Sequence, residues 1–310
     1  MKIVVVGAGA VGGLFGGLLA RSGETVSFVA RGRQLEALRG RGLRVESPLG
    51  NFEVRAPASE DPAALGPADL VLVAVKTWQL REVAPRLGPL VRAGTVVVPL
   101  ENGVEAADVL SAALRDGSVV GGLCHVLAWV ESPGLVRHGG PAPRATLGER
   151  WGGPSERLDR IAAAFRAAGI EAVVTLDVQQ ALWEKFLFID PFGTAGAVSR
   201  CPIGEMRETA ETRVLLVTLM REVAALAKAR GVSLPADVID RTLARLDALP
   251  FEATASMQRD LVAGRPSELF EQTGAVVRLA AAAQVPVPAH DALFACLVPQ
   301  EARARRPARP

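Results

Sequence analysis

The chain has 310 residues, of which 49% are hydrophobic and 22% charged, and its formal net charge is +2. This length accommodates two domains with large cores, and so small a net charge gives no sign of a nucleic-acid-binding surface. No apolar run approaches the roughly 18–20 residues of a membrane span, no signal-peptide pattern opens the chain, and three widely spaced cysteines predict a reducing compartment, the cytoplasm.

The first part of the chain alternates strand-like and helical segments. Strands are expected at 2–6, 25–30, 69–76, 95–100, 144–148 and 170–174, with a hairpin of 43–46 and 52–56 and short strands within 118–131. Helices are expected after the first strand as far as residue 20, and at 78–88, 104–115 and 155–168. This alternation predicts an α/β domain over residues 1–176 with a mostly parallel, doubly wound sheet of the Rossmann type.

Strand signals stop after about residue 176. Helical stretches follow at 178–198, 205–230, 235–247, 251–263 and 267–284, separated by glycine and proline. We therefore expect a second, all-helical domain over residues 177–298. The polar, proline-bearing segment 299–310 is expected to be a disordered tail.

A glycine-rich loop follows the first strand. Its sequence GAGAVG consists of Gly7, Ala8, Gly9, Ala10, Val11 and Gly12. In this strand–loop–helix context, the first glycine permits a tight turn, the second a close approach to pyrophosphate, and the third close packing of helix and strand. The helix N-terminus then supplies free N–H donors for the phosphates. Simple tight packing of small residues is the alternative explanation.

The end of the second strand carries Arg31, nineteen residues after Gly12. An acidic residue at this place would bind the ribose 2′-hydroxyl of NAD, whereas arginine can pair with a 2′-phosphate. A solvated surface arginine is the alternative. The position therefore favours NADP(H) as the cofactor.

Two further polar residues directly follow core strands. Lys76 follows DLVLVAV, and Asn102 follows TVVVPL within the sequence ENG. Open α/β sheets bind ligands at the carboxyl ends of their strands, so both residues are candidates for the cofactor site. Ordinary turn chemistry also explains them, because Asn-Gly is a strong turn former.

The helical part contains one informative stretch, ALWEKFLFIDPFGTAGAV at 181–198. Lys185 shares its helical face with apolar residues, which is costly unless the lysine lines a cleft or finds a partner. Alternatively, its stem packs there while its ammonium group reaches water. The chain has no tyrosine, which excludes the reductase families that protonate a carbonyl with that residue.

Six short motifs carry a family resemblance. They are GAGAVG at 7–12, AVKTWQ at 74–79, ENG at 101–103, LWEK at 182–185, SMQRD at 256–260 and SE at 267–268. In this order they resemble the ketopantoate reductases (2-dehydropantoate 2-reductases), from residue 2 to about 297. The resemblance implies a Rossmann domain and a helical domain with the active site between them. It also implies reduction of ketopantoate to pantoate with NADPH, towards pantothenate and coenzyme A.

The resemblance also implies roles for single residues of the helical domain. Lys185 becomes the general acid that protonates the carbonyl oxygen, and Glu268 binds the hydroxyl side of the substrate. Ser256 binds the substrate carboxylate. Without the resemblance, Glu268 reads as a first-turn carboxylate favoured by the helix dipole, and Ser256 as an ordinary helical serine.

In the first domain, the resemblance places Asn102 near nicotinamide and substrate. Lys76 and Arg31 become cofactor-side residues, with Arg31 at the 2′-phosphate. The chain departs from the family at Ile189 and Gly193, where many members carry asparagine. Asparagine at position 189 would offer polar contacts to the lysine or the substrate, and Ile189 offers none.

Three functions are compatible with these features. The first is an NADPH-dependent reductase of a small 2-oxo acid, and the second is a β-hydroxyacid or 6-phosphogluconate-type dehydrogenase. The third is a non-enzymatic NADP(H) sensor, which Ile189 favours and the retained Lys185, Ser256 and Glu268 oppose. Three histidines without ligand spacing predict no metal site. A homodimer is compatible with the sequence.

Overall fold

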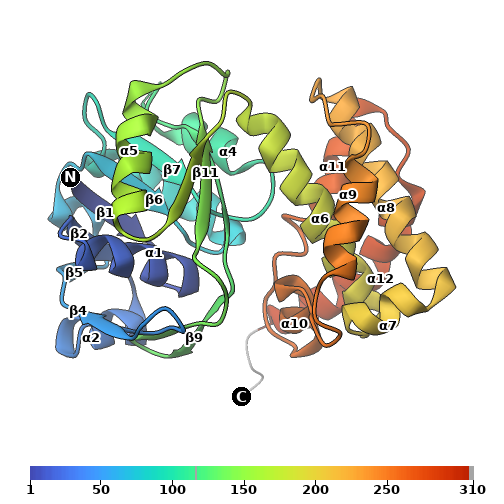
Figure 1. Cartoon of the computed structure of the whole chain (residues 1–310), viewed down its shortest axis with the longest axis horizontal. Coiled ribbons are helices and arrows are strands. Elements are labelled where there is room, and N and C mark those ends of the chain that lie inside the picture. Colours follow the sequence, from blue (N-terminus) through green and yellow to red (C-terminus); the bar gives the residue numbers. More distant parts are fainter. Residues whose placement is uncertain (116, 307–310) are drawn as a thin grey trace. The chain divides into compact units, whose positions relative to one another are not determined.

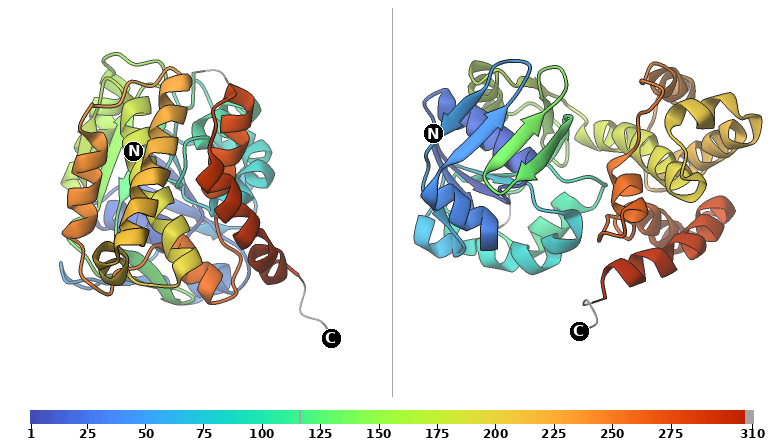
Figure 2. Two further views of the ribbon diagram at one scale, coloured as in Figure 1. Left: turned by 90° about the vertical axis from the view of Figure 1, so that its right-hand side faces the viewer. Right: turned by 90° about the horizontal axis from the view of Figure 1, so that it is seen from below.

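The computed structural model describes residues 1–115 and 117–306 of the chain. These residues form two compact units, Met1–Gln179 and a second unit that begins at Gln180. The sequence pattern placed the change of architecture at residue 176. The first unit combines strands and helices, and the second is drawn entirely as helices and loops (Figures 1 and 2).

The core of the first unit is a five-stranded parallel sheet with the order β5-β2-β1-β6-β7. Its strands are β1 (Lys2–Val6), β2 (Thr25–Val29), β5 (Ala58–Ser59), β6 (Leu70–Val73) and β7 (Val96–Pro99). The chain moves outward from β1 to β5 and then returns to add β6 on the other side of β1. This switch point is where doubly wound sheets bind ligands, at the carboxyl ends of the strands. The predicted fold class is confirmed.

Helices cover both faces of this sheet. Ile3 and Val5 of β1 belong to the hydrophobic cluster that contains Leu14 of α1, whereas Val4 and Val6 belong to the opposite cluster. The helices are α1 (Ala10–Arg21), α2 (Gly32–Gly40), α3 (Leu80–Val83), α4 (Ala106–Ala113) and α5 (Glu156–Ala167). Such alternate burial on two sides is typical of a central strand in a doubly wound sheet.

Two helical regions of the first unit differ from expectation. Helix α2 was not expected, because its sequence GRQLEALRG offers few apolar positions. The segment expected as one helix at 78–88 is broken into η2 (Thr77–Gln79), α3 and the 3₁₀ turns η3 (Ala84–Leu90). Prolines in η3 remove backbone donors and disfavour a continuous α-helix.

Two smaller sheets complete the first unit. The predicted hairpin forms from β3 (Leu43–Glu46) and β4 (Phe52–Val54), and its sheet has the order β4-β3-β10-β9 with β9 (Ala128–Ser132) and β10 (Leu135–His138). The third sheet consists of β8 (Gly121–His125), β11 (Arg144–Gly148) and β12 (Glu171–Val174). Helix α1 lies close to the large sheet and to the sheet that contains β10. A Cβ on Gly16 would lie 2.6 Å from Phe28 of β2, and one on Gly13 would lie 2.9 Å from Val136 of β10.

The second unit is built from seven helices in the part of it that the structure describes. They are α6 (Val178–Ser199), which begins just before this unit, α7 (Ile203–Glu208), α8 (Ala210–Ala229), α9 (Val238–Asp247), α10 (Ser256–Val262), α11 (Thr273–Ala283) and α12 (Pro288–Ala304). The stretch expected as one helix at 205–230 is split at Thr209, whose backbone is extended. Helices α10 and α11 begin several residues later than expected, because turns precede both.

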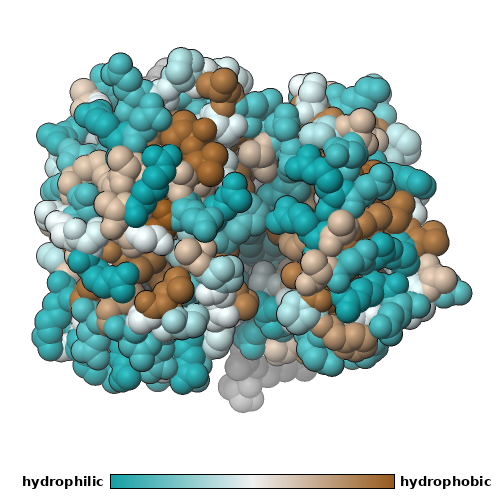
Figure 3. Space-filling model, viewed as in Figure 1, coloured by the Kyte–Doolittle hydropathy of each residue, from teal (hydrophilic) through white to brown (hydrophobic). Residues whose placement is uncertain are grey.

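The expected tail from residue 299 is wrong for residues 299–304, which belong to α12. Tertiary contacts hold this end of the helix, since Glu301 is fully buried and accepts hydrogen bonds from the backbone and side chain of Ser267. Residues 307–310 lie outside the described residues. Surfaces of both units are mostly hydrophilic with separate hydrophobic patches (Figure 3). Within residues 1–115 and 117–306, no helix combines the length and apolarity needed to cross a bilayer.

Candidate active site

The glycine loop turns sharply between β1 and α1. Gly7 has a φ of +95°, and a Cβ at this position would lie 2.7 Å from the carbonyl oxygen of Ala74. A Cβ on Gly12 would lie 2.0 Å from the carbonyl oxygen of Gly7. Any other residue at either position would therefore have to displace the backbone.

The side of the loop at Gly9 is open. Gly9 precedes the first residue of α1, and a Cβ there would meet no atom within 4 Å. Ala8 is buried, while Ala10 and Val11 begin a helix whose first turn carries no acidic side chain. The free N–H groups and the positive end of α1 thus face space that an anion can enter. These features fit the pyrophosphate of a dinucleotide.

Gln34 of α2 braces this loop and was not identified from the sequence. Its Nε2 donates a hydrogen bond of 2.7 Å to the carbonyl oxygen of Ala8, and its Oε1 accepts one of 2.9 Å from the backbone N–H of Gly134. The sequence gives no sign of this role, because both partners are backbone groups that lie 26 and 100 residues away in the chain.

Arg31 lies at the carboxyl end of β2, next to β1 in the sheet. It is the residue before the first turn of α2, and its side chain is exposed, as is that of Arg33. Gly32 between them has a φ of +53°. An exposed guanidinium beside a helix N-terminus is suited to a phosphate group.

The loops that carry Lys76 and Asn102 are joined to each other. Thr77 Oγ1 donates a hydrogen bond of 3.1 Å to the carbonyl oxygen of Asn102, and the backbone N–H of Val75 donates to Glu101 Oε1 at 3.3 Å. Lys76 itself is exposed and follows β6 closely, as Asn102 follows β7. The two candidates therefore belong to one connected edge of the sheet.

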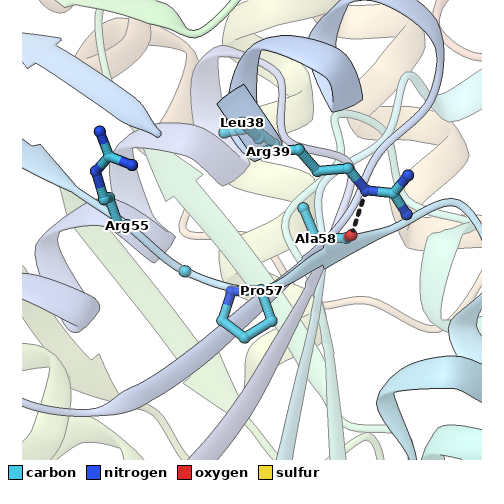
Figure 4. Close-up of a pocket in the computed structure, with 6 residues that line it drawn as sticks. Leu38, Arg39, Arg55, Pro57 and Ala58 are labelled. Carbon is cyan, nitrogen blue, oxygen red and sulfur yellow. Dashed lines mark hydrogen bonds between the residues drawn. The ribbon is translucent and has the colours of Figure 1, made fainter. Parts of the chain in front are cut away.

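A separate pocket of about 350 Å³ lies beside the edge strand β5 (Figure 4). It is lined by Leu38, Arg39, Arg55, Ala56, Pro57 and Ala58. The guanidinium of Arg39 donates a hydrogen bond of 3.0 Å to the carbonyl oxygen of Ala58. Since β5 lies two strands away from the switch point between β1 and β6, we do not include this pocket in the candidate site.

Lys185 of α6 is a buried lysine with 7% of its surface exposed. Within the part of the chain that the structure describes, its ammonium group has no hydrogen-bond or ion-pair partner. The neighbouring carboxylate of Glu184 is instead bonded to Gln180 and Arg241. A largely buried lysine without a partner for its charge is unusual in a helix, so Lys185 is a strong candidate for a functional group.

Ser256 begins α10, which packs closely on α6. A Cβ on Gly193 would lie 3.0 Å from Met257 Cε, and one on Gly196 would lie 2.4 Å from Gln258 Oε1. Gly193 and Gly196 share a face of α6 with Lys185, at eight and eleven residues' distance. A side chain at 193 would therefore require the flexible end of Met257 to move. Ser256 itself is exposed.

Glu268 is buried, with 5% of its surface exposed. The expectation that it lies in the first turn of a helix is wrong, because α11 begins at Thr273 and Glu268 belongs to the preceding turn. Its Oε2 accepts a hydrogen bond of 3.3 Å from Gln272 Nε2. The direction of the Glu268 carboxylate is therefore set by the turn and by contacts such as the one with Gln272.

A buried cluster of charged side chains fixes the other side of α6. His290 Nε2 lies 2.8 Å from Asp190 Oδ2, and His290 Nδ1 lies 2.6 Å from Glu222 Oε2. Burial lowers the pKa of His290, but the two carboxylates outweigh it and raise the pKa to about 9. The imidazolium ties α6, α8 and α12 together. Its partners are up to one hundred residues away in sequence, so the cluster was not predicted.

Comparison with known proteins identifies the family. The family described as "Ketopantoate reductase PanE/ApbA" matches residues 3–151, and its C-terminal part matches residues 177–301. The 2-dehydropantoate 2-reductase of Halobacterium salinarum is 34% identical over 291 residues, which are 93% of this chain and 95% of that protein. The chain belongs to the ketopantoate reductase family. It is therefore an oxidoreductase, and the expected resemblance is confirmed.

Solved structures agree with this membership. A PanE/ApbA family ketopantoate reductase from Ralstonia eutropha JMP134 has a TM-score of 0.91 at 32% identity, covering 99% of this chain and 100% of that one. D-mandelate dehydrogenase, solved with NADH and anilino(oxo)acetate, has a TM-score of 0.90 at 22% identity, covering 99% of this chain and 100% of that one. The second comparison shows a shared fold.

Proposed function

We propose that this ketopantoate reductase family member reduces a 2-oxo acid to a 2-hydroxy acid with NADPH, and that ketopantoate is its substrate and pantoate its product. This reaction is a step towards pantothenate and coenzyme A. The observation that carries the proposal is the buried, unpaired Lys185. It lies on the face of α6 against which α10, with Ser256 as its first residue, is packed.

The first unit has the groups that a dinucleotide requires. The open loop at Gly9 and the N-terminus of α1 would hold the pyrophosphate, and Arg31 would hold the 2′-phosphate. Lys76 and Asn102, on their joined loops, would contact the nicotinamide side. NADPH, when bound, supplies the hydride for the keto carbon.

The second unit supplies the groups for the substrate. Lys185 donates a hydrogen bond to the carbonyl oxygen, stabilises the negative charge that develops there, and gives up its proton to form the hydroxyl. Ser256 binds the carboxylate, and Glu268 accepts a hydrogen bond from the hydroxyl at the other end of ketopantoate. Asn102 of the first unit completes the contacts of the 2-oxo acid.

Cofactor choice is tested by Arg31→Asp. The unmodified protein should bind NADPH more tightly than NADH, and the variant should reverse this order, because it loses a phosphate contact and gains a repulsive charge. Loss of a charge-assisted contact weakens NADPH binding by about 10- to 100-fold. Titration of both cofactors measures this, with Arg39→Asp, an equal change of charge in α2, as the control. Equal affinities of the unmodified protein for both cofactors would contradict the assignment.

Substrate selectivity is tested through Ile189, which stands where family members carry asparagine. An apolar side chain offers no hydrogen bond to the substrate, so selectivity for its hydroxyl should be weak. We expect a preference for ketopantoate over 2-oxoisovalerate, which lacks the hydroxyl, of about 10- to 200-fold. The measurement is kcat/KM for each acid at saturating NADPH. A preference above about ten-thousandfold would show that other residues replace the asparagine fully.

A further inference from the structure

The turn that carries Glu268 is anchored through Ser267, a fully buried residue. The backbone N–H of Ser267 donates to both carboxylate oxygens of Glu301, at 3.1 Å each. Its hydroxyl donates to Glu301 Oε2 at 2.6 Å and accepts from the backbone N–H of Leu269 at 3.1 Å. Glu301 therefore determines both the backbone and the side-chain direction at the entrance of the turn.

Arg305, the residue that follows the last turn of α12, completes this contact. Its Nε donates to Glu301 Oε1 at 2.6 Å, and a terminal nitrogen of the same guanidinium donates to the carbonyl oxygen of Ser267 at 2.9 Å. Glu301 is fully buried, and each of its oxygens accepts two hydrogen bonds. We call Ser267, Glu301 and Arg305 the α12 clamp. A carboxylate so fully bonded is rigid and expensive to disturb.

Glu268 is the residue directly after Ser267 of this clamp. It precedes the first residue of α11 by five positions, and its backbone carbonyl accepts hydrogen bonds from Glu271 and Gln272 at 3.2 and 2.9 Å. Glu271 lies near the same charges: burial raises its pKa to about 7 against the opposing effect of Arg305, and the carboxylates of Glu268 and Glu301 contribute to the rise. The clamp thus lies among the charges that surround the proposed substrate-binding carboxylate.

We propose that Glu301, held by Arg305, is a positioning residue that sets the Ser267–Glu268 turn and thereby directs the Glu268 carboxylate toward the hydroxyl of the substrate. The proposal rests on the role of Glu268 in the proposed function. It assigns a part in substrate selection to the last turn of α12, which acts through the turn that carries Glu268. Two variants weaken the clamp to different degrees. Glu301→Gln removes the charge that Arg305 and Ser267 bind, whereas Ser267→Ala removes only the hydroxyl and keeps the backbone hydrogen bonds.

The first readout is selectivity for the substrate hydroxyl. In Glu301→Gln, kcat/KM for ketopantoate should fall by about 10- to 100-fold, as expected for a displaced contact group. The value for 2-oxoisovalerate, which has no hydroxyl for Glu268, should stay within about threefold, since its contacts are unaffected. Ser267→Ala should lower the ratio of kcat/KM for ketopantoate to kcat/KM for 2-oxoisovalerate as well, but by a smaller factor. Asp291→Asn, an exposed carboxylate change on the same helix, should leave the ratio unaltered.

The second readout is hydrogen exchange, which does not depend on activity. Exchange of the backbone amides of 267–272 should accelerate in Glu301→Gln and stay unchanged in Asp291→Asn. Unchanged exchange in this segment, or equal losses of kcat/KM for both acids, would overturn the positioning role alone. If the unmodified protein reduces neither acid, the proposed function fails, and the positioning role fails with it.

Discussion

Replacing Lys185 with alanine is expected to lower kcat by at least about a hundredfold, the lower end of the range for general acid catalysis. The affinity for NADPH should barely change, because the groups proposed to bind its phosphates belong to the first unit. Within the described residues Lys185 has no partner for its charge, so its removal breaks no hydrogen bond or ion pair. The loss of kcat is therefore expected in a protein that remains folded.

Two variants serve as controls for this result. Lys228→Ala removes an exposed lysine from α8 of the same unit and should leave kcat unchanged. Lys185→Arg keeps the positive charge, but a guanidinium gives up its proton poorly, so turnover should not recover. Nearly full turnover by Lys185→Ala would mean that Lys185 is a structural residue and that another group protonates the carbonyl oxygen.

Replacing His290 with glutamine is expected to destabilise the fold by about 3–5 kcal/mol at pH 7, because Asp190 and Glu222 lose the cation between them. Its pKa of about 9 lies above the ordinary value of 6.5. The stabilisation from the charged His290 is thus fully present below pH 6.5 and is lost as the pH rises through 9. The difference in unfolding free energy between variant and unmodified protein should therefore narrow at high pH.

Denaturant unfolding at several pH values measures this difference. His138→Gln is a suitable control, because His138 is also buried but its ring nitrogens contact Ser47 Oγ and the carbonyl oxygen of Pro141. If the difference in unfolding free energy between His290→Gln and the unmodified protein stays constant from pH 6 to about pH 10, the cluster does not hold an imidazolium.

The parts of this fold that depend on local sequence could be predicted. The strand at Lys2–Val6, the glycine turn and the helix after it follow from an apolar run, a steric requirement at Gly7 and a helical pattern. The alternation of such units is sufficient to indicate a parallel sheet with a switch point. Lys185 could also be singled out, because a charge on an apolar helical face is unusual in any context.

Other features depend on contacts between distant segments. The last turn of α12 looks polar and proline-bearing in sequence, and it is helical because Glu301 meets Ser267, 34 residues earlier. Likewise, nothing near His290 in the sequence indicates that Asp190 and Glu222 surround it. Gln34 reaches the glycine loop from a helix that local pattern did not indicate. Pairings of this kind are set by tertiary packing and have no local signature.

The central claim is that the chain transfers hydride from NADPH to a 2-oxo acid and that Lys185 supplies the proton. The most direct measurement follows NADPH absorbance during incubation of the unmodified protein with a panel of 2-oxo acids that includes ketopantoate, in parallel with Lys185→Ala. We expect steady oxidation of NADPH with ketopantoate, formation of pantoate in equal amount, and a rate at least about a hundredfold lower in the variant. No oxidation of NADPH with any acid of the panel would contradict the account and favour a protein that only binds the cofactor.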